Sequence, residues 1–141
     1  MNRRVLGRGR ALATIGAIGL LIACVLPWYT AGGARFELPV TTRNAFDGAG
    51  ILVFIAAVAI IALVLLPYAA GDQPLAMDRA LGFAIAAGLG IVGLVLKVVQ
   101  QLGYGESSGM YPDRAPGLWL AGAALAIVVW GVSEIAAKRD R

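Results

Sequence analysis

Lys97 and Gln100 are the residues of this chain whose types and positions are best suited to chemistry, because both lie at the end of a long apolar stretch. An ionisable side chain in such a stretch is a candidate for contact with an ion, a substrate or a partner. Small residues precede Lys97 at intervals of three and four, so all of these positions share one face of a helix. We call this set the Lys97 face; its residues are Gly82, Ala86, Gly90, Gly93, Lys97 and Gln100.

The depth of Lys97 along its helix determines how costly the charge is. Counted from Ala80 at about 1.5 Å per residue, Lys97 lies roughly 25 Å along a hydrocarbon core of about 30 Å. Its cost is therefore expected to be well below the roughly 2.5–3.5 kcal/mol of a charge at the bilayer centre. Asp47 is the expected partner, and Glu37 is the second choice. Three roles stay open: a structural lysine that is paired or snorkels, an anchor for a protein or lipid partner, and a transport or ligand site.

Long apolar stretches position these residues and define the fold class. The chain of 141 residues is 60% apolar and only 14% charged, whereas soluble proteins are about half apolar and a quarter charged. Each stretch is near the roughly 20 residues that cross a bilayer as a helix. We therefore predict an all-α fold, a single four-helix transmembrane bundle over residues 1–141. The predicted spans are about 11–29, 48–68, 80–100 and 117–137.

Basic residues at the two ends of the chain predict its orientation. They precede the first span and follow the last one, which favours a cytoplasmic location for both termini. The net charge of +4 is therefore interpreted as a topology signal, and no nucleic-acid partner is expected. We expect a multi-pass protein of the plasma membrane, the inner membrane of a bacterium. The terminal basic residues are Arg3, Arg4, Arg8, Arg10, Lys138, Arg139 and Arg141.

The first outer segment, 31–48, is predicted to contain a short β segment. Apolar and polar residues alternate from Arg35 to Thr42, a pattern typical of strands, and Pro39 restricts such a strand to a sheet edge. The second outer segment, around 103–112, is rich in glycine and is predicted to be an interfacial loop, with a partner-binding loop as the alternative.

Helix starts are predicted at three positions. Asp47 and Asp78 are suited to cap spans two and three, because an aspartate side chain accepts hydrogen bonds from the free N–H groups of a first turn. Pro116 is suited to the first turn of span four.

The residue types that support catalysis are scarce. The chain has no histidine, which is the commonest general base and metal ligand, so no enzymatic activity, metal or cofactor is expected. Cys24 is the single cysteine and is interpreted as a small packing residue. The alternative is lipidation, since Leu21-Ile22-Ala23-Cys24 resembles a bacterial lipoprotein box.

Short motifs at the span ends resemble those of small uncharacterised four-helix membrane proteins of actinobacteria. They are Leu26-Pro27-Trp28-Tyr29, Asn44-Ala45-Phe46-Asp47-Gly48 and Gly117-Leu118-Trp119-Leu120. The resemblance implies a membrane location and no activity. The outline is also similar to claudin-like four-helix proteins, whose first outer segment is a small sheet. The cysteine pair and tryptophan signature of those proteins are missing here, so no functional residue is carried over.

Small residues at packing intervals, without catalytic groups, favour a non-catalytic role. We expect an accessory or scaffold subunit that binds other membrane proteins or further copies of itself within the lipid bilayer. The alternative is a small channel or transporter formed by oligomerisation, with a pore between protomers lined by the Lys97 face.

Overall fold

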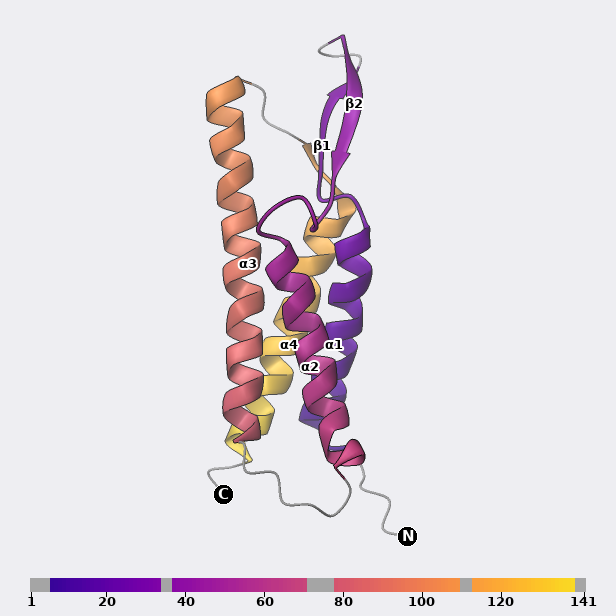
Figure 1. Ribbon diagram of the computed structural model, residues 1–141, viewed down its shortest axis with the longest axis vertical. Coiled ribbons are helices and arrows are strands. Elements are labelled where there is room, and N and C mark those ends of the chain that lie inside the picture. The colour runs from indigo at the N-terminus through magenta and orange to yellow at the C-terminus, as the bar shows by residue number, and fades with distance from the viewer. Residues whose placement is uncertain (1–5, 34–36, 71–77, 110–112, 139–141) are drawn as a thin grey trace.

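The computed structural model describes residues 6–33, 37–70, 78–109 and 113–138, and within these it contains four helices and one small sheet. Figure 1 shows the helices side by side, with the sheet at one end of the bundle, which we call the sheet end. Each helix is long and apolar enough to span a membrane. The helices are α1 (Arg8–Val25), α2 (Ile51–Ala69), α3 (Arg79–Ser108) and α4 (Pro116–Ala137).

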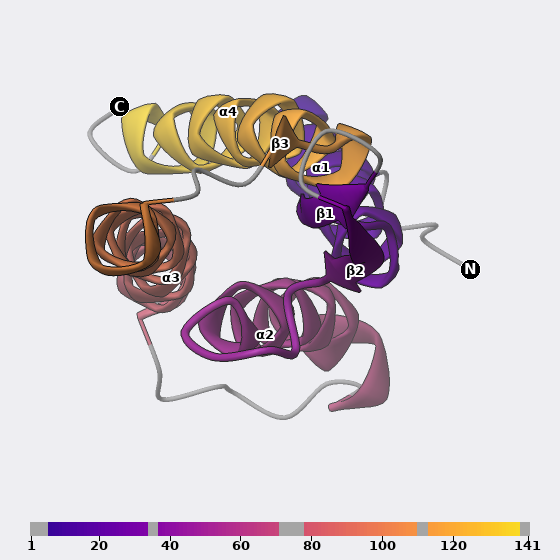
Figure 2. The same ribbon diagram turned by 90° about the horizontal axis from the view of Figure 1, so that it is seen from above.

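The predicted four-helix fold is confirmed, and the protein is a multi-pass membrane protein. Viewed along the bundle, each helix lies beside two others, in the order α1, α2, α3, α4 around the axis (Figure 2). Apolar residues lie on both the buried and the exposed sides, for example Ile60 inside and Ile55 outside on α2. This arrangement suits a bundle whose outer surface contacts lipid.

The closest helix contact joins α1 and α4 through glycines. A Cβ atom built on Gly131 would lie 2.6 Å from the Ala13 nitrogen and 2.7 Å from the Gly9 carbonyl oxygen. A Cβ atom on Gly16 would lie 2.8 Å from the Val128 nitrogen. Because the obstructing atoms are main-chain atoms, these glycines allow the two backbones to touch, as small residues do between membrane helices.

The predicted β segment is also present, as part of a three-stranded antiparallel sheet. The strands are β1 (Tyr29–Gly33), β2 (Leu38–Arg43) and β3 (Asp113–Arg114), in the order β2-β1-β3. Tyr29 pairs with Arg43 on one side and with Arg114 on the other. Hydrogen bonds from Ala115 N to Trp28 O (3.0 Å) and from Gly117 N to Pro27 O (2.9 Å) continue this pairing to the start of α4. The sheet therefore holds the ends of α1 and α4 together.

The first helix ends earlier than the predicted span. It stops at Val25, because Pro27 has no N–H to donate to the Ala23 carbonyl. The indole Nε1 of Trp28 donates to that oxygen instead, at 2.7 Å, and its ring is fully buried. Trp28 is thus a core residue at the junction of helix and sheet.

Two of the three predicted helix starts are confirmed. Asp78 caps α3, where its side chain accepts hydrogen bonds from Ala80 N and Leu81 N, and Pro116 is in the first turn of α4. The prediction for Asp47 is wrong, since α2 begins after Gly50. The Asp47 carboxylate accepts from Asn44 N at 3.0 Å and closes a turn that precedes the helix.

Candidate functional site

Lys97 lies fully buried at the sheet end of the helical core. Its ammonium donates a hydrogen bond to the main-chain carbonyl of Asp47, in the turn before α2. The expected residues therefore meet, but through a carbonyl oxygen in place of the carboxylate. Glu37, the second choice, is an exposed residue at the start of the β2 hairpin arm. Gln100 lies one turn beyond Lys97, and its side-chain oxygen accepts from Ala49 N at 3.3 Å.

The small residues of the Lys97 face lie against the neighbouring helices of the same chain. A Cβ atom on Gly93 would lie 2.7 Å from the Cβ atom of Leu52, and one on Gly90 would lie 3.3 Å from the Cβ atom of Ala56. Ala86 is buried and Gly82 is half-buried. These contacts explain why small residues recur on this face: they bring α3 close to α2 and leave Lys97 and Gln100 beside the turn that begins α2.

The third helix is longer than predicted, and this changes what the Lys97 face contains. It continues from Gln100 to Ser108 and ends with Gly109 in the left-handed conformation (φ 70°). The prediction of a loop around 103–112 is therefore wrong for residues 103–108, which are helical. Residues 110–112 lie outside the described residues. The extension adds Gln101 and Tyr104 four and seven residues after Lys97, on nearly the same face.

Packing explains why the helix continues through a glycine-rich segment. Gln101 is only 8% exposed, and Gly105 is buried. The Arg43 guanidinium lies over the Tyr104 ring, 5.7 Å from its centroid. Contacts of this kind offset the roughly 1 kcal/mol by which each glycine disfavours a helix.

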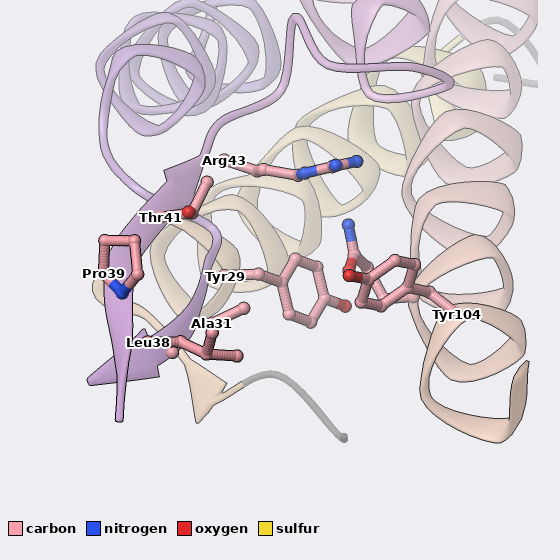
Figure 3. Close-up of a pocket in the computed structure, with 9 residues that line it drawn as sticks. Tyr29, Ala31, Leu38, Pro39, Thr41, Arg43 and Tyr104 are labelled. Carbon is pink, nitrogen blue, oxygen red and sulfur yellow. The ribbon is translucent and has the colours of Figure 1, made fainter. Parts of the chain in front are cut away.

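The extension and the sheet enclose a cavity of about 240 Å³. Figure 3 shows Tyr29 and Tyr104 pointing toward one another across it, from β1 and α3, with Arg43 beside them. Strand alternation accounts for the lining, because the cross-strand pairs Tyr29–Arg43 and Ala31–Thr41 present their side chains on one face of the sheet. Gln101 completes the wall on the α3 side.

A wider groove of about 590 Å³ adjoins this cavity. The two share Thr41, Arg43 and Gln101, and the groove continues to Gly48 and Gln100 beside the buried Lys97. We call the two together the sheet-end groove. In this groove Gln100, from the Lys97 face, reaches the surface close to the buried Lys97.

The electrostatics of the groove are set by few groups. Beside the wider part, Arg43 and Lys97 supply two positive charges and Asp47 one negative charge, and Arg114 is a further positive charge close to Tyr29 in the cavity. Burial raises the pKa of Tyr29 above its ordinary value of 10.0, although the nearby Arg114 charge acts in the opposite direction. Tyr29 is therefore an uncharged hydrogen-bonding group at neutral pH.

Several residues that line the cavity were not recognised as candidates in the sequence. Tyr29, Arg43, Gln101 and Tyr104 come from three separate segments, and their meeting depends on the register of the sheet and the length of α3. The spacing of Gln101 and Tyr104 from Lys97 was the one available signal. Gly103, just before Tyr104, and Gly105, just after it, obscured that signal, because glycine disfavours a helix.

The single cysteine and the acidic residues are the other groups considered for chemistry. Cys24 is fully buried in α1, as expected for a packing residue. Within 6–33, 37–70, 78–109 and 113–138, no three acidic or cysteine side chains are grouped closely enough to hold a metal ion.

No protein-family model matches this chain, and no curated protein matches it at a significant level.

Proposed function

We propose that the protein is a non-catalytic accessory or scaffold subunit of a bacterial plasma membrane, which binds other membrane proteins through its sheet end. In this proposal both termini are cytoplasmic and the sheet end lies outside. The tight α1–α4 contact and the sheet that joins their ends supply a rigid body, which a scaffold needs.

The observation that carries the proposal is the exposure of β2. It is an edge strand, since β1 pairs with it on one side and, in the part of the chain that the structure describes, no strand pairs on the other. All six of its residues are exposed, and Val40 is 66% exposed. An open edge strand with apolar side chains favours contact with another chain.

A channel or transporter formed by oligomerisation has weaker support. Such a pore was expected to be lined by the Lys97 face, but Gly90 and Gly93 are packed against other helices of the same chain. The pore would therefore require α3 to separate from α2. The buried core at mid-bundle is apolar as well, as Ile60 and Val128 illustrate.

Mass analysis after purification in a mild detergent tests the proposed function. The intact chain is expected to be recovered as a homo-oligomer or with a defined membrane-protein partner at fixed stoichiometry, and Val40→Lys is expected to abolish that association. Leu6→Lys is the matched control, because it adds the same charge at an exposed apolar position near the start of α1. A monodisperse monomer without partners, or equal loss of association in both variants, would contradict the proposal.

A further inference from the structure

The sheet-end groove has the position, shape and charge of a lipid headgroup site. Its position is fixed by the helices around it. The first turn of α2 lies beside Gly93, and Lys97 contacts the turn just before α2. The 19 residues of α2 span about 28 Å at 1.5 Å per residue, which is close to the thickness of a hydrocarbon core. Lys97 therefore marks the hydrocarbon boundary at the sheet end.

The groove begins at this boundary and extends away from the hydrocarbon core along α3. Gln101 and Tyr104 lie about 6 Å and 10 Å further along α3 than Lys97. The headgroup region adds about 5–8 Å to each side of the hydrocarbon core. The cavity between Tyr29 and Tyr104 thus begins in the headgroup region, at the level of Gln101, and the wider part of the groove opens beside the boundary at Gly48 and Gln100.

The charges of the groove favour an anion. Arg43 and Lys97 are near enough to repel each other, and the Asp47 carboxylate offsets only one of these two charges. The Asp47 side chain is also engaged by Asn44 N. An anion bound beside Arg43 relieves the repulsion, and a guanidinium group matches the geometry of a phosphate with two parallel N–H donors.

The remaining lining supplies neutral donors and an apolar wall. The Thr41 hydroxyl, the Tyr29 hydroxyl and the Gln101 amide all border the cavity that Arg43 enters. Ala31 and Leu38 line the same cavity and suit the carbon atoms of a glycerol unit. Arg43 is itself exposed, so a ligand reaches it without any opening of the bundle.

From these observations we propose that the sheet-end groove binds the phosphate and glycerol headgroup of an anionic phospholipid from the adjacent leaflet. Arg43 is the principal phosphate contact. The Lys97 ammonium supplies a second positive charge, because it lies next to Gly48, which lines the groove. The proposal does not depend on the proposed scaffold function, since a lipid bound at this depth leaves Val40 on the opposite face of the sheet.

The test compares the loss of one arginine that lines the groove, Arg43, with the loss of one arginine that does not, Arg114. The full-length chain is placed in nanodiscs of phosphatidylcholine with a trace of phosphatidylglycerol that carries a fluorophore on one acyl chain, and lipid binding is measured by fluorescence transfer from the protein's tryptophans. Arg43→Gln is the test variant. Arg114→Gln is the matched control, because Arg114 is also exposed and pairs with Tyr29 in the sheet, but its guanidinium lies over the Trp119 ring and it is not one of the residues that line the groove. Both variants remove one positive charge from the sheet end.

We expect Arg43→Gln to weaken phosphatidylglycerol binding by about tenfold or more, and Arg114→Gln by less than about twofold. Arg43→Lys is expected to recover only part of the loss, because it restores the charge without the paired donors. Equal weakening by both Gln variants would overturn the proposal, since general surface charge would then explain the attraction. Equal affinity for phosphatidylcholine would overturn it as well. Inorganic phosphate or glycerol phosphate that displaces the lipid at matching concentrations would show a site for a soluble anion and would overturn the lipid assignment.

Discussion

The contact between α1 and α4 predicts an opposite outcome for the same substitution at two glycines of one helix. Gly131→Ala places a methyl group 2.6 Å from a main-chain nitrogen of α1, whereas Gly122→Ala meets nothing within 4 Å. Ordinary contact begins near 3.4 Å. The first variant therefore requires α1 to move away from α4 by about 0.8 Å, because main-chain atoms cannot rotate aside as a side chain does.

The magnitude follows from two opposing terms. Overpacking of a close contact costs about 1–3 kcal/mol, and replacing glycine by alanine inside a helix contributes up to about 1 kcal/mol in the opposite direction. Gly131→Ala is expected to lower the free energy of unfolding by about 1–2 kcal/mol. Gly122→Ala is expected to leave it unchanged or raise it by up to about 1 kcal/mol.

Both changes in the free energy of unfolding can be measured by titrating the detergent-purified protein with sodium dodecyl sulfate while circular dichroism monitors the loss of helix. Gly88→Ala provides a second control on α3, because its added methyl group also meets nothing within 4 Å. If Gly131→Ala is as stable as the two controls, α1 and α4 do not touch through their backbones and the reasoning about this contact fails.

Three further predictions concern local interactions. Asp78→Ala removes the acceptor for Ala80 N and Leu81 N and is expected to cost about 1 kcal/mol in the same titration, while Asp78→Asn retains most of the stability. Trp28→Phe leaves the Ala23 carbonyl without its indole donor and is expected to cost about 1–3 kcal/mol. Since the pKa of Tyr29 is raised by burial, its contribution to stability is fully present below pH 10.0 and is lost as pH rises through the folded-state pKa. Ultraviolet titration is expected to show this tyrosine ionising later than it does in the unfolded chain, and later still in Arg114→Ala.

The fold was predictable because a bilayer leaves few choices to an apolar chain. Long apolar runs must satisfy their backbone groups as helices, and the four helices were found close to the predicted spans. Local signals also succeeded where the chemistry is local, as at Asp78 and Pro116. Asp47 failed as a cap because the main chain passes through Gly48, which has a positive φ, and α2 begins only after Gly50.

The candidate site was predictable only in part. The spacing of Gly90, Gly93 and Lys97 identified the face of α3 that meets α2. The groove could not be predicted, because it depends on pairing between β1 and β2 and on a helix that continues through Gly103 and Gly105. The sequence pattern singled out the Lys97 face of α3, whereas the closest backbone contact lies between α1 and α4. Glycine spacing alone does not predict which helices pack closest, because a glycine brings two helices together only where it faces the backbone of another helix.

The central claim is that the groove lies outside the cell, on a helix that extends beyond the bilayer, with the chain termini on the opposite side. Single cysteines introduced by Glu106→Cys near the end of α3 and by Lys138→Cys after α4 test it, since both positions are exposed and the native Cys24 is buried. A membrane-impermeant maleimide is predicted to label the Glu106→Cys variant in intact cells, and to label the Lys138→Cys variant only after the cells are permeabilised. Labelling of the Lys138→Cys variant in intact cells, with the Glu106→Cys variant protected until permeabilisation, would contradict the account.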